Sequence, residues 1–427
     1  MRKIHYSWYI CAACTLMLFA CMGMGANGFS IFMPMIQEVY GFTSTQVSSF
    51  ITIRNLVCFC AMFSVGLYYD KLGYRIGTTL ATLFAAAAYI GFSISRTYAM
   101  FCVSTAIMGL AYCFGTMIPA AILMNKWFVK NRALALSVCG AGTGVAMIIL
   151  PPISTGLVDA IGLSATFRAE GIFIIITAAF VALIVRSNPE DIGLMPLGAE
   201  IDDASAEKSS AVQNENVEET AAKIDASEQN DDRLPKILWV TLISASMLMG
   251  AVASVGYAHL SVLYSSAGFD SGYIAAMISG IGLLLTLGKL LFGYMADRIG
   301  GYKTSMIFWI FLIAGDLLCC FAYAGSHIIN IIVAFTLGIG YALSNLGTSV
   351  WSNDMGKGAQ YAKLVRYLQI SMSGGALITS NVPGILADLS GTGSYLPAYI
   401  MFTVFCLVSA ALTAVSYSYY GRMTAKY

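Results

Sequence analysis

The stretch GFDSGYIAAMISGIGLLLTLGKLLFGYMADRIG, residues 268–300, decides the fold because the chain contains a second copy of it. The other copy is GFTSTQVSSFITIRNLVCFCAMFSVGLYYDKLG, residues 41–73, and the two align without a gap at an offset of 227 residues. Eight positions carry the same residue in both copies: Gly41/Gly268, Phe42/Phe269, Ser44/Ser271, Ile51/Ile278, Leu56/Leu283, Gly66/Gly293, Asp70/Asp297 and Gly73/Gly300. A duplicated apolar segment at equivalent places in the two halves indicates that the chain consists of two parallel structural repeats.

The composition indicates an integral membrane protein. Hydrophobic residues make up 58% of the 427 residues and charged residues only 11%, which is outside the usual range of soluble proteins. Twelve apolar runs are long enough to cross a hydrocarbon core of about 30 Å as helices. They are predicted at 8–33, 46–68, 76–95, 98–124, 133–157, 167–186, 236–263, 272–296, 304–324, 327–350, 361–387 and 395–420. Because the runs are continuous rather than alternating, a β-barrel is excluded, and we predict an all-α protein of twelve transmembrane helices in two six-helix repeats.

A polar insert separates the two sets of six spans. We predict an N-terminal six-helix bundle over 1–186, an acidic cytoplasmic linker over 187–234 and a C-terminal six-helix bundle over 235–427. The insert contains more than half of the 22 acidic residues and almost no aromatic residues, a composition typical of a disordered linker. Most of the 23 lysines and arginines lie in loops on the side of the termini, so both termini are expected in the cytoplasm. With short loops and no targeting extension, we expect a multi-pass protein of a bacterial cytoplasmic membrane.

The loop after the second span has the pattern G-x-x-x-D-[RK]-x-G-x-[RK], and the loop after the eighth span nearly repeats it. The first copy is Gly66, Asp70, Lys71, Gly73 and Arg75, and the second is Gly293, Asp297, Arg298, Gly300 and, displaced by one, Lys303. Two such copies in a twelve-helix frame resemble the major facilitator superfamily. The resemblance implies a transporter that works by alternating access, with its site between the halves. Each Asp is then expected to contact a neighbouring helix N-terminus and favour one conformation, although a helix stop with basic flanks is the simpler alternative.

A narrower resemblance covers most of the chain. The stretches NKWFVKNRALALSVCGAGTGVAMIILPPI (125–153), NPEDIGLMPLG (188–198) and YAHLSVLYSSAGFDSGYIAAMISGIGLLLTLGKLLFGYMADRIGG (257–301) are similar to the monocarboxylate porter and oxalate/formate antiporter group. This resemblance implies that the substrate is a small organic anion, a mono- or dicarboxylate.

Lys289 is the first candidate for contact with that anion. In the group that the chain resembles, an arginine four residues before the loop glycine contacts the substrate carboxylate, and Lys289 stands four residues before Gly293. A lysine at this depth costs roughly 2.5 to 3.5 kcal/mol on insertion scales, so it is expected to face a cavity or a partner rather than lipid. The alternative is an ion pair with a helix-packing acid such as Asp316.

Other polar residues within the spans are further candidates for substrate binding. Arg54 is expected either to contact substrate or to form a salt bridge at the outer gate, and Arg366 either to face the cavity or to snorkel to the cytoplasm. For His259 we favour a place in the substrate cavity, with a hydrogen bond across helices or proton relay as its chemistry. The remaining candidates are Asn27, Tyr257, Tyr341, Asn345 and Gln369.

The sequence predicts no enzymatic activity, cofactor, metal site or nucleic-acid partner, because none of the corresponding motifs occurs in or beside the spans. Proton-linked members of the group that it resembles place an Asp one turn before the arginine of the eighth helix, where this chain has Leu285. Asp316 is the best remaining acid, but it lies on the ninth span, which is usually peripheral in the fold that the chain resembles. Simple carboxylate-mediated proton symport is therefore disfavoured, and exchange for a counter-anion is left open. The rival functions are a porter of the same fold for a sugar, peptide or drug, and a transporter-like sensor.

Overall fold

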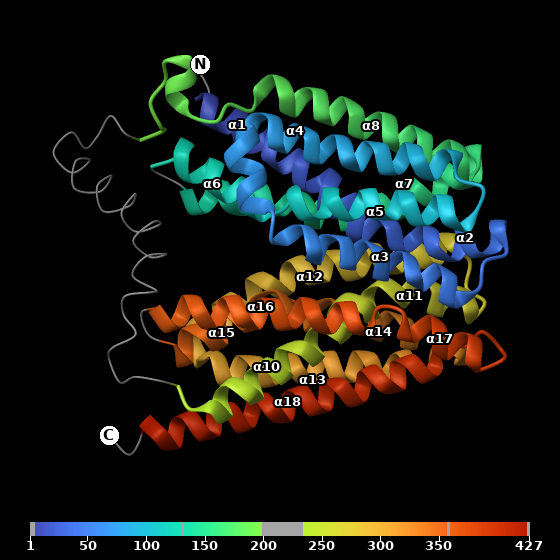
Figure 1. Ribbon diagram of the computed structural model, residues 1–427. Helices are drawn as coiled ribbons and strands as arrows, with labels where there is room; N and C mark the ends of the chain where they lie inside the picture. Colours follow the sequence, from blue (N-terminus) through green and yellow to red (C-terminus); the bar gives the residue numbers. More distant parts are fainter. Residues whose placement is uncertain (1–4, 130–131, 199–233, 357–358, 425–427) are drawn as a thin grey trace.

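The computed structural model describes residues 5–129, 132–198, 234–356 and 359–424. The N-terminal half is a bundle of helices (Figure 1). Its elements are α1 (Tyr6–Leu18), η1 (Phe19–Asn27), η2 (Gly28–Ile31), α2 (Phe32–Tyr40), α3 (Ser44–Met62), α4 (Val65–Ile94), α5 (Tyr98–Phe114), α6 (Met117–Trp127), α7 (Arg132–Ile161) and α8 (Leu163–Ile184). Its first crossing consists of four consecutive helical pieces, α1, η1, η2 and α2.

The C-terminal half forms a second bundle that lies beside the first (Figure 1). Its elements are α10 (Lys236–Gly250), η5 (Ala251–Gly256), α11 (Tyr257–Ser266), α12 (Ser271–Ile299), α13 (Gly301–Cys319), η6 (Ala322–Ala324), α14 (His327–Gly340), α15 (Ala342–Met355), α16 (Ala359–Thr379), α17 (Val382–Leu389) and α18 (Leu396–Thr424). We call the end where α1 begins and α18 ends the terminal end, and the opposite end the distal end. The described residues contain helices and one isolated β-bridge, so the prediction of an all-α membrane fold is confirmed.

The backbone repeats the internal symmetry of the sequence. Gly41 and Gly268 have φ angles of 67° and 88°, and Gly73 and Gly300 have φ angles of 70° and 86°. Residues with a side chain rarely adopt these angles, so each glycine provides a sharp change of direction at the same place in both repeats.

The first crossing of each half also widens at the same level. The segment η1 and its counterpart η5 are π-helical, a rare geometry that is frequent at functional sites. Two carbonyls of η1 accept side-chain hydrogen bonds: Met24 from the Tyr89 hydroxyl at 3.0 Å, and Gly25 from Arg54 at 3.1 Å. In η5, the Gly256 carbonyl accepts from the Tyr399 hydroxyl at 2.8 Å.

The predicted spans differ from the structure mainly at their ends. The expected loop around 69–75 is part of α4, which continues through a kink at Gly73. The single runs predicted at 98–124, 327–350 and 361–387 are each divided into two helices. Among the described residues, ten helical segments are long and apolar enough to cross a membrane, and α3 and α16 are not among them. Both carry polar residues along one face, because they line the space between the halves.

Part of the predicted linker is packed against the N-terminal half. Leu197 exchanges two backbone hydrogen bonds with Trp127 and Val129, each 3.0 Å long. Lys126 donates to the Asn188 side chain at 2.9 Å, and the Trp127 indole donates to the Arg186 carbonyl at 3.1 Å. Residues 187–198 therefore cover the end of α6, and the expectation of disorder applies to 199–233, which lie outside the described residues.

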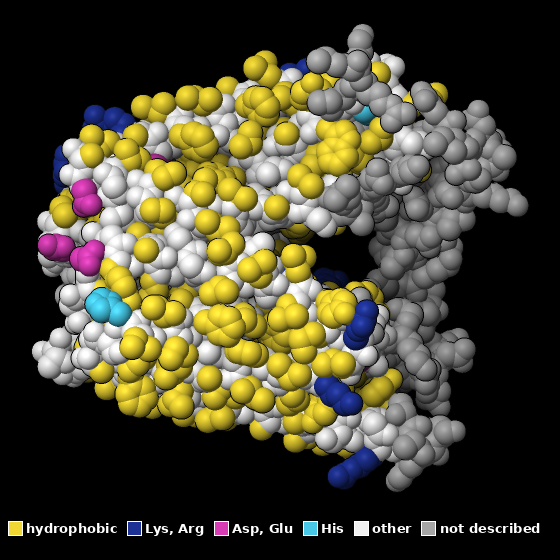
Figure 2. Space-filling view, turned by 180° about the vertical axis from the view of Figure 1, so that it is seen from behind, with side chains coloured by type: hydrophobic (Ala, Val, Ile, Leu, Met, Phe, Trp, Pro, Cys, Tyr) yellow, Lys and Arg dark blue, Asp and Glu magenta, His cyan; other side chains and the backbone are white. Residues whose placement is uncertain are grey.

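The two halves meet near the distal end and separate toward the terminal end. At the distal end, the Ser261 hydroxyl of α11 donates to the Ser30 carbonyl of η2. The close-packed Gly384 of α17 lies against Ser44 and Ser48 of α3. At the terminal end, Figure 2 shows a hollow between the halves, with lysine and arginine side chains near it on the C-terminal half. The structure is thus closed distally and open on the terminal side.

The crossing between α10 and α16 generates a prediction about stability. A Cβ on Gly375 would lie 1.9 Å from the Met247 carbonyl oxygen, whereas a Cβ on its neighbour Gly374 would meet nothing within 4 Å. Gly375→Ala should therefore separate the helices and destabilise the protein by about 1 to 3 kcal/mol, the usual cost of overpacking. Gly374→Ala, the matched control, should leave the melting temperature unchanged or raise it, because alanine favours a helix. Thermal unfolding of the purified variants measures this, and equal melting temperatures would refute the tight crossing.

Candidate functional site

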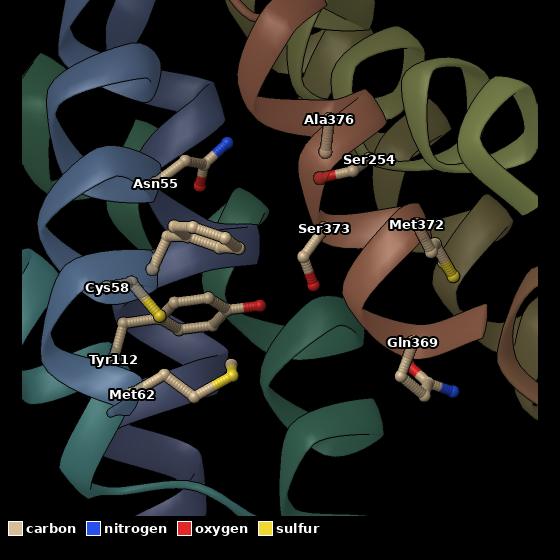
Figure 3. Close-up of a pocket in the computed structure, with 10 residues that line it drawn as sticks. Asn55, Cys58, Met62, Tyr112, Ser254, Gln369, Met372, Ser373 and Ala376 are labelled. Atoms are coloured by element: carbon tan, nitrogen blue, oxygen red, sulfur yellow. The ribbon is translucent and has the colours of Figure 1, made fainter. Parts of the chain in front are cut away.

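A cavity of about 200 Å³ lies between the two halves. From the N-terminal half it is lined by α3 and α5, and from the C-terminal half by η5 and α16. Figure 3 shows the two sets of side chains facing one another across it. The lining residues are Asn55, Cys58, Phe59, Met62, Tyr112, Ser254, Gln369, Met372, Ser373 and Ala376.

Helical periodicity explains why these residues face the cavity. On α16, positions 369, 372, 373 and 376 are separated by three or four residues and so share one face. The same face continues to Ser380 on the distal side and to Arg366 on the terminal side. Ser380 accepts a hydrogen bond from the Asn55 side chain at 3.1 Å, so the face of α16 meets α3 directly beyond the cavity.

The lining is polar but uncharged. Amide, hydroxyl and phenol groups come from Asn55, Tyr112, Ser254, Gln369 and Ser373, and the remaining lining residues are apolar or contain sulfur. The Gln369 amide donates to the Thr348 hydroxyl at 3.0 Å, which fixes its orientation. These groups can exchange neutral hydrogen bonds with a solute, and methionine side chains adapt to its shape.

Arg54 lies directly behind the cavity wall. Its side chain is buried, with 5% exposure, and its Nη1 donates to the Gly25 carbonyl of the π-helical segment η1. Its Nε and Nη2 donate to the Asn55 Oδ1 at 3.4 and 3.2 Å, and the guanidinium lies 5.3 Å from the centre of the Tyr112 ring. Arg54 therefore orients two lining residues and places a positive charge behind them.

Lys289 lies outside that lining, on α12. It is half-buried, and in the described part of the chain its ammonium has no hydrogen-bond or ion-pair partner. The nearest turn of α12 on the distal side carries Thr286, whose hydroxyl oxygen lies 3.1 Å from where a Cβ on Gly144 of α7 would be. The alternative pairing with Asp316 does not occur, because one carboxylate oxygen of Asp316 accepts from Cys406 and the other has no partner among the described residues.

His259 lies at the contact between the halves rather than in the cavity wall. It is fully buried on α11. Its Nδ1 lies 2.9 Å from the Val255 carbonyl and its Nε2 lies 2.9 Å from the Ser48 hydroxyl of α3. Because a carbonyl can only accept, Nδ1 carries the hydrogen and Nε2 accepts from Ser48. The histidine thus joins the two bundles across their distal contact.

The other predicted binding residues are dispersed. Gln369 lines the cavity, and Arg366 is exposed one turn closer to the terminal end. Tyr257 and Tyr341 are buried, with ring centres 5.9 Å apart, and Asn345 donates to the Tyr341 carbonyl at 3.1 Å. The Asn27 side chain lies outside the part that the structure describes.

The residues of the two loop motifs lie at the terminal end. Asp70 and Lys71 are exposed, the Arg75 Nε donates to the Ala182 carbonyl at 2.9 Å, and the Arg298 guanidinium lies over the Tyr294 ring. The side chain of Asp297 lies outside the described residues. In this open arrangement the first motif holds helices of its own half together and leaves its carboxylate facing solvent.

Sequence reasoning missed two groups of residues. Tyr112, Ser254 and Ser373 line the cavity, but uncharged residues in an apolar helix give no signal of a site. The second group closes the distal end around Asp388, whose oxygens accept from the backbone N–H groups of Ser44 at 3.0 Å and Thr45 at 2.8 Å. The charge thereby stabilises the N-terminus of α3 from the opposite half. In the sequence, Asp388 is a single acid near the end of a helix, and nothing in that pattern indicates a contact with the opposite half.

Comparison with known proteins gives consistent matches. The sequence model of the Major Facilitator Superfamily matches residues 15–288. An agnestins efflux protein of Paecilomyces divaricatus is 23% identical over 77% of this chain and 68% of its own. Monocarboxylate transporter 12 of Mus musculus is 22% identical over 93% of this chain and 82% of its own. The oxalate:formate antiporter of Oxalobacter formigenes is 23% identical over 79% of this chain and 75% of its own.

Among solved structures, the nucleoside transporter NupG superimposes with a TM-score of 0.72. The match covers 97% of this chain and 99% of NupG at 12% sequence identity. At this identity the likeness establishes a shared fold.

The Asp388 contact predicts how the distal closure depends on pH. Partial burial alone would raise the pKa of Asp388, but hydrogen bonds from Thr45 and Ser44 outweigh it and hold the pKa below its ordinary value of 3.8. The stabilisation is therefore complete above pH 3.8 and is lost as the pH falls through the lowered pKa. In Asp388→Asn, amides in the first turns of α3 should exchange with deuterium about two- to fivefold faster at neutral pH, as expected for a charge at a helix terminus.

The difference between wild type and Asp388→Asn should shrink as the pH falls below 3.8, once intrinsic exchange rates are corrected. Asp159→Asn is the control, because Asp159 is an exposed acid at the distal end of α7. Identical exchange in wild type and Asp388→Asn at neutral pH would show that the charge does not hold the contact.

Proposed function

This chain belongs to the major facilitator superfamily of membrane transporters, and we propose that its solute is a small organic anion, a mono- or dicarboxylate, moved by alternating access. The family and the fold are those of transporters rather than enzymes. The protein is a multi-pass membrane protein, and its binding site for a small solute is expected between the halves.

The observation that carries the proposal is the half-buried charge of Lys289. An ammonium inside a membrane protein is costly unless a partner or water stabilises it, and Lys289 has no acidic partner among the described residues. The lining of the cavity contains no carboxylate, while Arg54 lies behind its wall and Arg366 near its terminal side. A negatively charged solute would find compensation here that a cation would lack.

The similarity to a monocarboxylate transporter and an oxalate:formate antiporter supports the same substrate class. Lysine in place of the arginine expected on α12 provides a single point charge instead of a planar two-point contact. We therefore expect Lys289 to restrict the orientation of a bound carboxylate less than an arginine at this position would.

The arrangement of the halves supports an alternating mechanism in which 1–186 and 235–427 move as two bodies joined by the segment between them. The terminal end is assigned to the cytoplasm, because lysines and arginines accumulate there, and the membrane is assigned as a bacterial cytoplasmic membrane. In this state the solute exchanges with the cytoplasm, while the contacts of His259 and Asp388 close the outer side. Transport requires these contacts to break as the motif residues at the terminal end come together.

A second candidate is a porter for a neutral polar solute. The specific observation in its favour is the uncharged lining of the cavity, where the described residues contribute amide, hydroxyl and phenol groups. The two candidates differ in whether Lys289 takes part in binding.

Transport assays with purified protein in liposomes test the proposal. Labelled mono- and dicarboxylates are compared with a labelled sugar and a nucleoside, with and without an imposed proton gradient. Accumulation of a carboxylate supports the anion proposal, and saturable uptake of the neutral solutes alone would overturn it.

Lys289 gives the sharpest mutational prediction. Lys289→Gln should abolish carboxylate transport while the protein remains folded, because no carboxylate among the described residues pairs with the ammonium and would be left alone. Loss of such a charge contact should cost about 2 to 5 kcal/mol of binding free energy. Lys289→Arg should retain activity with an altered preference among anions. Lys363→Gln is the control, because Lys363 is exposed on α16. Lys289→Gln with unchanged affinity and rate would eliminate the anchor role.

Substitution of the acidic residues in the two loop motifs should change the transport rate rather than the affinity for the solute. Asp70 is exposed at the open end and follows Met62, the last cavity-lining residue of α3, by eight residues. Asp70→Asn and its repeat equivalent Asp297→Asn should lower the maximal transport rate and leave the affinity nearly unchanged, because they alter the conformational equilibrium. Initial-rate kinetics measure both quantities, and a loss of affinity at normal protein levels would contradict the gating role.

A further inference from the structure

Asp316 is a buried acid whose surroundings differ from those of an ordinary structural carboxylate. It lies on α13 within the C-terminal half and has 0% exposure. Its Oδ2 accepts a hydrogen bond from the Cys406 thiol of α18 at 3.1 Å. Its Oδ1 is buried and has no hydrogen-bond partner among the described residues.

The titratable groups that interact with Asp316 in the described residues are thiols and phenols. They are Cys319 and Cys320 of α13, Tyr341 between α14 and α15, and Tyr399 and Cys406 of α18. Within the described chain, no lysine, arginine or histidine is among these neighbours. An ionised carboxylate here would lack a cation, and burying such a charge without one is strongly unfavourable.

Two buried hydroxyls connect this acid to the wall of the cavity. Tyr257 follows the lining residue Ser254 by three residues, close to one turn of the helix. Its ring packs against that of Tyr341 with 5.9 Å between centres, and Tyr341 interacts electrostatically with Asp316. The hydroxyls of both tyrosines are buried without a hydrogen-bond partner in the described residues.

Three polar groups without partners in one region of a membrane protein call for a ligand. Buried polar atoms are almost always satisfied, and water molecules commonly complete such sites. Water molecules bound to these groups would join the hydroxyls into a path along which a proton can move. The site suits a proton because, with no cation among its described neighbours, the carboxyl is favoured as the neutral acid.

We propose that Asp316 is the proton-binding site that couples transport to the proton gradient. The proton is taken up when the O–H bond of the carboxyl forms, and it is released to water when that bond breaks. Uptake and release follow the path through Tyr341 and Tyr257 from the cavity. The inference rests on the proposed transport function. Of the two modes considered for it, proton symport and exchange for a counter-anion, the inference favours proton symport. In this proposal the proton-binding acid lies on α13. Proton-linked members of the monocarboxylate group carry an Asp on the eighth helix, and at that position on α12 this chain has Leu285.

Proteoliposome assays separate binding from coupling. Asp316→Asn should keep solute exchange between labelled and unlabelled pools, because exchange needs no net proton movement, and should lose proton-driven accumulation. Glu170→Gln is the matched control: Glu170 is a buried acid of the other half, and its Oε1 accepts from the Ser154 hydroxyl at 2.6 Å. That variant should keep both activities. Tyr341→Phe should slow proton-driven accumulation and spare exchange.

A measurement made without solute tests the proton-binding site independently of the proposed substrate class. Infrared titration of wild-type protein should show the carbonyl stretch of protonated carboxylic acid at neutral pH, and Asp316→Asn should lose a component of that band which Glu170→Gln retains. Failure of every carboxylate in the transport panel would overturn the proposed function, whereas a band unchanged in Asp316→Asn would overturn the proton site. Accumulation that ignores the proton gradient, follows a sodium gradient, or persists in Asp316→Asn would also overturn it.

Discussion

The state of this protein depends on the contact between α3 and α17 at the distal end. Helices in lipid gain no hydrophobic free energy by meeting, so close packing and polar contacts must hold them together. Gly384 provides the close approach, since a side chain there would overlap Ser44 and Ser48. Asp388 adds a charge at the N-terminus of α3, where Thr43 already accepts from Gln46. With this end closed, the halves diverge toward the terminal end and leave the cavity between them.

Inside each half, buried polar groups must likewise find their hydrogen-bond partners within the protein. Arg54 and Tyr89 donate to carbonyls of the π-helical segment in the first crossing. Arg54 also donates to Asn55, which in turn donates to Ser380 of the opposite half. A single buried guanidinium thereby links a distorted helix, the wall of the cavity and the contact between the bundles. A solute that alters the orientation of Asn55 would affect all three.

The charges and the cavity lining have separate positions in this fold. The lining offers neutral hydrogen-bonding groups, the positive charges lie behind it or along its approach, and the buried acid lies deeper in the C-terminal half. This separation lets one region recognise the shape of a solute while others respond to its charge or to a proton. The family fold permits many solutes, so the substrate class depends on these particular side chains.

The sequence by itself determined the membrane class, the two repeats and the glycine turns, because apolar length and turn chemistry are local properties. The offset between the copies correctly paired Gly41 with Gly268 and Gly73 with Gly300, whose backbone angles agree. It also identified Arg54 and Lys289 as buried charges, since the cost of such residues is evident from their depth in an apolar run. Span ends were less accurate, because helices in this protein continue through kinks and into polar loops.

Only the tertiary structure decided which of these residues meet. It placed Gln369 in the cavity wall, Arg54 behind it and His259 against Ser48. It also brought Asp388 to a helix that begins more than 300 residues earlier in the chain. The physical reason is that helical periodicity fixes the face on which a residue lies, whereas the partner of that face depends on how the helices of both halves pack. Placing uncharged residues such as Ser254 and Tyr112 deep in the membrane costs far less free energy than placing a charge there. Their position in the sequence therefore does not mark them as functional, and only the packing shows that they line the cavity.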